Sequence, residues 1–432
     1  MNEHTGFRRS LETIGVALLA IFLGLLASSV FVIIAGSNPV DAYQRLFCEG
    51  FGARGCETFG NLLVQTVVNE DTGESQTVFS PLHGTGGHSL ALVLERATPL
   101  ILTALSATVA FKAGLFSIGM DGQFVLGALA AAFLGYWFPA QLYTLFGVTD
   151  PELAPEALKT IMHIIVPAVC LGAAMMAGAF YSWIAGYLKV KLNINVLIST
   201  IILNAIAVQF VGYMVNYPLR SDMNNIARTA RIDETAWLIP FNRGLFANAD
   251  IEWFSGSRLG VGFIIAVVAA VLVWYFLYRT TRGYEQRMVN GSPLFARFSG
   301  IPGTHAMLRA MLISGALSGI AGAIEVIGVE RRIVDGFATA GTGFDGVLVA
   351  ILARESIVGI LFVAPFIAGL EQGAINFQFG NLPRQLGNII IALIILFNAM
   401  EYFLRSYIAA IWRKRHIFSG KSITPAPTEA SS

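Results

Sequence analysis

Long apolar stretches, each close to the thickness of a lipid bilayer, constrain this chain more than any other feature. A transmembrane helix needs about 20 apolar residues. Only 13% of the 432 residues are charged and 55% are hydrophobic, whereas a soluble domain has roughly a quarter of its residues charged. The sequence therefore predicts an all-α polytopic membrane protein with about ten transmembrane helices, at residues 11–36, 97–113, 114–138, 161–188, 196–217, 260–278, 310–329, 337–353, 357–377 and 386–407.

The distribution of lysine and arginine predicts the orientation of these helices. Cationic loops of membrane proteins stay on the cytoplasmic side. The cationic residues of one side are the stretch 279–309 together with Arg8, Arg9, Lys112, Lys189, Lys191, Arg354, Arg413, Lys414 and Arg415. The other side holds the acidic loop 37–96, and Arg331 and Arg332 are its main exceptions. We expect a bacterial inner-membrane protein with both termini in the cytoplasm.

This topology divides the chain into two transmembrane halves and their connections. The external loop 218–259 is rich in aromatic residues, as expected of a folded lid or of a segment on the membrane interface. The predicted parts are a tail and first helix 1–36, an external loop 37–96, a first half 97–217, an external loop 218–259, a linking helix 260–278, a cytoplasmic coupling loop 279–309, a second half 310–407, and a disordered tail 408–432.

A short motif occurs once in each half. Gly119-Met120-Asp121-Gly122 opens the third segment, and Gly343-Phe344-Asp345-Gly346 lies in the eighth. Under the predicted topology these two segments cross the membrane in opposite directions, so segments two to five and seven to ten form an inverted repeat. Glycine-interrupted segments at matched positions of two halves indicate a transport path.

Polar residues inside the apolar runs are candidates for that path, because ionisable groups in a membrane are costly and usually functional. The candidates are the polar residues Asp121, Gln123, Asn204, Glu325, Asp345 and Glu371, together with Phe344 beside Asp345. Asp121 and Asp345 have an alternative interpretation, which we favour, as caps of the backbone N–H groups at broken helices. The alternative interpretation of Glu325 and Glu371 is that each is a structural ion-pair partner of Arg331 or Arg384.

The stretch 279–300 is typical of a docking element. Four arginines and one acid surround Ser292-Pro293, and the apolar residues Leu294 and Phe295 follow. A loop that only joined two helices would have little use for such residues in water. The alternative is an amphipathic helix on the lipid headgroups. The predicted contacts with a partner are Ser292, Pro293, Leu294, Phe295, Arg297 and Gly300.

The sequence predicts neither catalysis nor a cofactor in this chain. The six histidines are scattered, and no nucleophile elbow, zinc-protease motif or phosphate-loop lysine occurs. No Cys/His cluster has metal-ligand spacing. Cys48 and Cys56 share an external loop, where a disulfide and two free thiols are equally open alternatives. The net charge of +1 argues against a nucleic-acid partner.

Four blocks of sequence resemble the membrane permease of bacterial ABC importers, in the family that serves branched-chain amino acids, simple sugars and nucleosides. The nucleoside-type permeases are the most similar, and the resemblance covers about residues 99–398. The blocks are FKAGLFSIG at 111–119 followed by Asp121-Gly122-Gln123, VLISTIILN at 196–204, ISGALSGIAGA at 313–323 and GTGFDG at 341–346.

The resemblance implies an importer with several partners. An external binding lipoprotein or periplasmic protein would deliver the solute, a nucleoside or a simple sugar. A second, different permease chain would complete the path, and a cytoplasmic ATPase would bind the ATP. Residues 292–300 would then be the coupling helix, with Phe295 entering an ATPase groove, so the docking interpretation gains over the headgroup one.

The chain also departs from the family pattern. Ser117 and Met120 replace an Asn and a Gly, Asn195 replaces a Glu, and the coupling loop 287–293 differs. These changes bear on the solute more than on the fold. An ion-coupled secondary transporter is the alternative function, and an intramembrane enzyme the least favoured.

Overall fold

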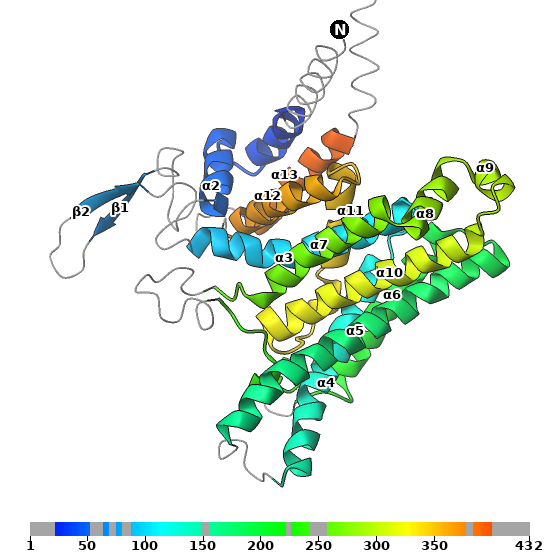
Figure 1. Cartoon of the computed structure of the whole chain (residues 1–432). Coiled ribbons are helices and arrows are strands. Elements are labelled where there is room, and N and C mark those ends of the chain that lie inside the picture. Colours follow the sequence, from blue (N-terminus) through cyan, green and yellow to red (C-terminus); the bar gives the residue numbers. More distant parts are fainter. Residues whose placement is uncertain are drawn as a thin grey trace, which may run out of the picture. The chain divides into compact units, whose positions relative to one another are not determined.

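A computed structural model describes residues 22–51, 64–68, 75–79, 88–147, 155–221, 226–241, 257–376 and 383–399 (Figure 1). The chain forms two compact units. The larger unit is Val40–Gly387, and the smaller combines Met1–Pro39 with Asn388–Ser432. In the smaller unit, the helix Phe22–Ile34 approaches Ile394 at Gly24, where an added Cβ would lie 2.9 Å from the Ile394 Cα.

Within the described residues, the larger unit is built from helices, together with one antiparallel strand pair that sets Val64 opposite Phe79 and three isolated β-bridges. Its elements follow one another in a fixed order. They are α2 (Pro39–Phe51), β1 (Val64–Val68), β2 (Ser75–Phe79), α3 (His88–Phe111), α4 (Met120–Leu145), α5 (Glu156–Leu192), α6 (Val196–Asn216), α7 (Val261–Arg279), α8 (Thr281–Gly291), α9 (Pro293–Phe298), α10 (Gly303–Ile324), α11 (Thr342–Leu352), α12 (Ile357–Asn376) and the start of α13 (Arg384–Ala399).

Within the described residues, seven helices are long and apolar enough to cross a membrane: α3 to α7, α10 with its extension to Glu330, and α12. The two helices before Cys48 would add an eighth if they form one broken span. The prediction of a helical, multi-pass membrane protein is confirmed. The number ten stays a prediction.

Several helix boundaries differ from those expected. The third segment was expected to begin at residue 114, but α4 begins at Met120, because Gly114 has a φ of +75° and the chain stays non-helical up to Gly119. The stretch 37–96, expected to be a loop, contains α2 and the first turns of α3. α2 lies against α12 so closely that a Cβ on Gly373 would be 2.0 Å from the Leu46 carbonyl oxygen.

The centre of the larger unit is α10, which packs on α4 and α5 through glycines. A Cβ on Gly315 would lie 2.3 Å from the Gly178 carbonyl oxygen, and one on Gly319 would lie 2.2 Å from that of Ala174. On the side of α4, a Cβ on Gly322 would lie 2.0 Å from the Phe124 carbonyl oxygen. Inside a membrane the hydrophobic effect does not drive helices together, and small residues allow the close backbone packing that holds them instead.

Serine hydroxyls add hydrogen bonds between these helices. Ser182 of α5 donates to the Met311 carbonyl at 2.7 Å, and Ser106 of α3 donates to that of Ser314 at 2.6 Å. Ser318 of α10 donates to the Met120 carbonyl at 2.6 Å. Each contribution is about 1 kcal/mol in membrane proteins. Ser318 also fixes which turn of α10 lies beside the start of α4.

The described part of the segment 218–259, which the sequence predicts to be external, is folded, as expected. Residues 226–241 pair with the chain that follows α10, for example through the Thr229 N–H and the Ile333 carbonyl at 2.9 Å. Trp237 lies beneath the guanidinium groups of Arg231 and Arg331, at 4.8 and 3.8 Å from its ring centre. This stacking gives Arg331 a structural role on the side where arginine was not expected.

Candidate translocation path and coupling element

The two repeated motifs occupy equivalent places in the structure. Each lies in the first turn of a helix, α4 or α11, and each helix follows a stretch without α-helix, 114–119 or 331–341. The starts of the two helices meet. A Cβ on Gly343 would lie 2.3 Å from the Asp121 Cα, so only glycine fits there.

Asp121 joins the two helix starts through its carboxylate. Its Oδ1 accepts a hydrogen bond from the Gly343 N–H at 3.2 Å, one of the N–H groups that lack a partner in the first turn of a helix. The cap interpretation of Asp121 is therefore confirmed, with the difference that Asp121 caps α11 and not its own helix. For Asp345 that interpretation is wrong, because among the described residues its carboxylate has no hydrogen-bond or ion-pair partner.

The start of α4 is held by α6 instead. Asn204 accepts a hydrogen bond from the Gly122 N–H at 2.9 Å and donates one to the Ile118 carbonyl at 2.7 Å. The Thr200 hydroxyl accepts from the Ile118 N–H at 3.3 Å. The side-chain amide of Asn204, a predicted path residue, thus holds the backbone at the start of α4 with one N–H and its oxygen.

We predict that Asn204→Leu lowers the free energy of unfolding by about 1–3 kcal/mol, because it leaves the Gly122 N–H and the Ile118 carbonyl without partners. The melting temperature of the detergent-solubilised protein measures this loss. Asn216→Leu, at the far end of the same helix, is the control, since the Asn216 amide bonds only to Gly212 and Asp335. Equal melting temperatures for wild type and Asn204→Leu would contradict the capping role.

Gln123 and Phe344 differ in their access to the surface. Gln123 is 1% exposed and Phe344 is 44% exposed. Gln123 is therefore enclosed by this chain's own helices, whereas Phe344 lies on an open face beside the Asp121 contact. Of the predicted path residues, Asp121, Asn204, Phe344 and Asp345 are gathered around the starts of α4 and α11.

Glu325 and Glu371 lie at a different level. Glu325 opens a π-helix, Glu325–Glu330, that continues α10, and π-helical turns are frequent at functional sites. It is seven residues beyond Ser318, or about 10 Å further along the helix. Arg96 lies near enough to act on the Glu325 charge, and the pairing of Glu325 or Glu371 with Arg331 or Arg384 stays a prediction. The side chain of Arg384 lies outside the described residues.

A polar cluster around Arg96 was missed from the sequence. Arg96 donates to Gln372, the neighbour of Glu371, at 2.7 Å. Glu95 accepts from the Arg258 N–H at 2.7 Å, and the Arg258 guanidinium donates to the Val329 carbonyl. The sequence feature that could have revealed this cluster is the charged pair Glu95-Arg96 within an apolar run. The second predicted segment began at residue 97 and therefore excluded the pair.

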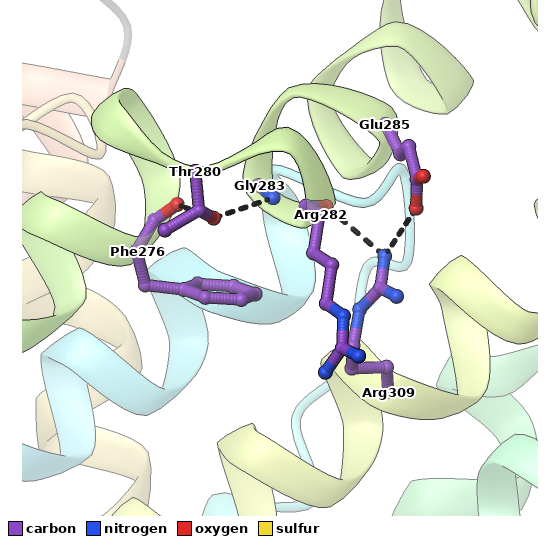
Figure 2. Close-up of polar contacts among 6 residues, drawn as sticks. All are labelled: Phe276, Thr280, Arg282, Gly283, Glu285 and Arg309. Carbon is purple, nitrogen blue, oxygen red and sulfur yellow. Dashed lines mark hydrogen bonds and ion pairs between the residues drawn. The ribbon is translucent and has the colours of Figure 1, made fainter.

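The polypeptide between α7 and α10 forms a hydrogen-bonded corner, shown in Figure 2, which is followed by a short helix. Thr280 caps α8 by accepting from the Gly283 N–H at 3.1 Å and donates to the Phe276 carbonyl at 2.7 Å. Arg309 of α10 reaches across to the Arg282 carbonyl at 3.0 Å and to the Glu285 carboxylate at 2.9 Å. These contacts fix α8 against α7 and α10.

α8 is also attached to the end of α3. The Gln286 amide, fully buried, donates to the Val109 carbonyl at 2.5 Å, and Asn290 donates to the Phe111 carbonyl at 3.1 Å. The last carbonyls of a helix lack partners within it, so these amides act as a C-terminal cap. Because α3 leads directly into the stretch 114–119, the corner is connected to the start of α4.

The predicted docking residues form α9, a helix of six residues. Ser292 is its N-cap, Pro293 its first residue, and Gly300, with a φ of +74°, follows its end. Ala296 packs inward against Val289 and Ala306. Leu294, Phe295 and Phe298 point outward with exposed fractions of 70%, 54% and 90%. Arg297 is exposed as well. Phe298, the most exposed of these, was not among the predicted contacts.

Two further predictions concern cysteine and metal. Cys48 is disulfide-bonded, while its expected partner, Cys56, lies outside the described residues, so the pairing stays a prediction. Cys170 is a buried free thiol. Within the part of the chain that the structure describes, no group of three or more His, Cys, Asp and Glu side chains could hold a metal ion.

Comparisons with known proteins agree with this architecture. The family model described as "Branched-chain amino acid transport system / permease component" matches residues 89–399. The chain is 29% identical to a guanosine ABC transporter permease of Bacillus subtilis (strain 168), over 92% of this chain and 97% of that protein. It is also 29% identical to a nucleoside ABC transporter permease of Lactococcus lactis subsp. cremoris (strain MG1363), over 90% of this chain and 91% of the other.

A third relative is a glucose ABC transporter permease of Haloferax volcanii, 29% identical over 91% of this chain and 89% of that protein. No solved structure matches. The family is a component of transport systems and not a class of enzymes, and its members work with an ATPase and a substrate-binding protein. The matched region, residues 89–399, contains the starts of α4 and α11 and the corner with α9. Because the match covers most of the chain, the chain belongs to the permease components of the branched-chain amino acid transport family.

Proposed function

We propose that this chain is the transmembrane permease subunit of an ABC importer and forms part of the path for a small polar solute. The solute class is a nucleoside, with a simple sugar as the second candidate, since the similar permeases are named for guanosine, nucleosides and glucose. The observation that carries the proposal is α9, a short helix that presents Leu294, Phe295 and Phe298 outward from a firmly attached corner.

The path would begin at the starts of α4 and α11. Asp345 has no partner among the described residues, and Phe344 is open to the surface. A hydroxyl-rich solute can donate to a carboxylate, and a base or sugar ring can stack on an aromatic face. Asp121 and Asn204 would act differently, by holding the two helix starts in place. Gln123 is enclosed, and Glu325 and Glu371 would lie further along the path.

Ten membrane segments are consistent with this proposal. To the seven long helices we add the broken span before Cys48 and two shorter apolar helices, Phe337–Leu352 and Gln385–Phe397. The matched positions of the two motifs support an inverted repeat. Lys112 pairs with Glu355 at 2.8 Å, so the ends of α3 and α11 lie together, beside α8, on the side proposed as cytoplasmic. Both termini would lie on that side of the inner membrane.

The transport cycle would need three partners. A cytoplasmic ATPase would bind the ATP and receive α9 in an apolar groove, so that this chain itself holds no cofactor. A second permease chain, different from this one, would complete the path. An external binding lipoprotein or periplasmic protein would deliver the solute to the side of the folded loop 226–241.

The test is purification at native expression followed by uptake into proteoliposomes. We expect an ATPase and a second permease to co-purify, and uptake of a radiolabelled nucleoside to require enclosed ATP and the binding protein. Competition with unlabelled glucose or ribose separates the two solute classes. Uptake by the chain alone, driven by a proton or sodium gradient, would instead establish a secondary transporter and overturn the proposal.

A further inference from the structure

The corner between α7 and α8 carries a concentration of positive charge beside a group of exposed aromatic rings. Trp274, Tyr275 and Tyr278 occupy the last turns of α7 and are all exposed. Tryptophan and tyrosine gather where a membrane meets water. Their position therefore places the end of α7 at the level of the lipid headgroups.

The arginines of the corner are held at that same level by the rings. The guanidinium of Arg279 lies 5.6 Å from the Trp274 ring centre, and that of Arg287 lies 5.0 Å from the Tyr278 ring centre. Arg282 is exposed. In Figure 2 its guanidinium lies away from the Glu285 carboxylate, which the Arg309 guanidinium engages.

The protein supplies little negative charge here. Glu285 is the single acid of the stretch 279–309, and its carboxylate is engaged by Arg309. Among the described residues, no ion pair includes Arg279, Arg282 or Arg287. Guanidinium groups bind phosphate through two parallel hydrogen bonds. A phosphate group at the level of the lipid headgroups would neutralise the positive charge of this corner.

We propose that the α7–α8 corner binds the headgroup of an anionic phospholipid, with Arg279 and Arg282 on the phosphate and Tyr275 and Tyr278 against the adjoining lipid. A groove of a partner protein is the other anionic surface to consider. The corner is less suited to it, because α9, which projects its apolar residues outward, lies a whole helix away. The 11 residues of α8 span about 16 Å.

The test uses the purified chain in a neutral detergent, with phosphatidylglycerol as the probe and phosphatidylcholine as its zwitterionic counterpart. We expect phosphatidylglycerol to raise the melting temperature and phosphatidylcholine to have little effect. In Arg279→Gln/Arg282→Gln, the phosphatidylglycerol concentration for half of the rise should increase roughly tenfold or more, since each cation near an anionic lipid surface contributes substantially. Without lipid, this variant should melt as the wild type does, because both side chains are exposed.

Arg297→Gln is the matched control, since it removes one exposed cation from α9, away from the aromatic rings. It should keep the wild-type response to phosphatidylglycerol. The Arg279→Lys/Arg282→Lys variant should recover only part of the response, because lysine cannot bind phosphate with two parallel bonds. Inorganic phosphate at the same concentration should leave the melting temperature unchanged, which identifies the lipid as the ligand.

Three outcomes would overturn the proposal. One is an equal response of the wild type and the Arg279→Gln/Arg282→Gln variant, and another is an equal loss in Arg297→Gln. The third is loss of the co-purifying ATPase from the double variant with its lipid response intact, which would assign the arginines to a protein partner. Because the measurement needs only this chain, its failure is distinct from a failure of the proposed transport function.

Discussion

Phe298→Asp is expected to abolish ATP-driven uptake while the protein still inserts and folds. Phe298 is 90% exposed on α9, so the substitution removes no internal contact. In an apolar groove of an ATPase, by contrast, an unpaired aspartate would cost several kcal/mol, which corresponds to a loss of coupled uptake of about a hundredfold or more. Phe295→Asp should act in the same direction, and less strongly, because Phe295 is only 54% exposed.

The measurement is uptake and ATP hydrolysis by the reconstituted complex at matched protein amounts. Phe298→Leu is the control, since it keeps an apolar side chain at the same position, and it should retain most of the uptake. The melting temperature of the isolated chain should be the same for the wild type, Phe298→Asp and Phe298→Leu. Wild-type uptake by Phe298→Asp would remove the coupling assignment of α9, and the headgroup interpretation would then take its place.

Gly319→Ala is expected to destabilise the whole bundle, although it adds only one methyl group. That methyl carbon would lie 2.2 Å from the Ala174 carbonyl oxygen, well inside van der Waals contact. Backbone atoms cannot turn aside as a side chain can, so α10 and α5 must separate. Overpacking of this kind costs about 1–3 kcal/mol and sometimes more.

The control for this prediction is the same substitution on α5. Gly172 has open space where its Cβ would be, and alanine favours a helix over glycine by about 1 kcal/mol. Gly172→Ala should therefore leave the melting temperature unchanged or raise it, while Gly319→Ala lowers it. If the two variants melt at the same temperature, α10 does not pack on α5 as closely as described.

The helix α9, proposed as the coupling element, was the part of the candidate site whose local structure the sequence predicted best. Ser292 and Pro293 are a favourable start for a helix whatever surrounds them, and Gly300 permits the positive φ that ends it. These are local preferences. Which of the residues between them face outward depends on the neighbours, because Ala296 turns inward toward Val289 and Ala306. Phe298 is exposed as a consequence, and no local pattern shows this.

The path residues were predicted less well. A polar residue in an apolar run indicates a function, but its partner usually comes from another helix. The sequence predicts a solute contact for Asn204. In the structure, Asn204 accepts a hydrogen bond from the Gly122 N–H at the start of α4, 82 residues away in sequence. In the same way, Asp121 caps a helix that begins 221 positions later, at Thr342.

The sequence by itself determined the class of the protein, its helical multi-pass character and the ends of the short helix α9. Hydrophobicity, turn chemistry and capping act over a few residues, and any chain with these residues shows them. Only the tertiary structure decided which glycines bring helices into contact, which acid meets which helix start, and where arginines gather without acids. Those properties arise between segments that are distant along the chain, because helix packing brings their atoms within a few ångströms of one another.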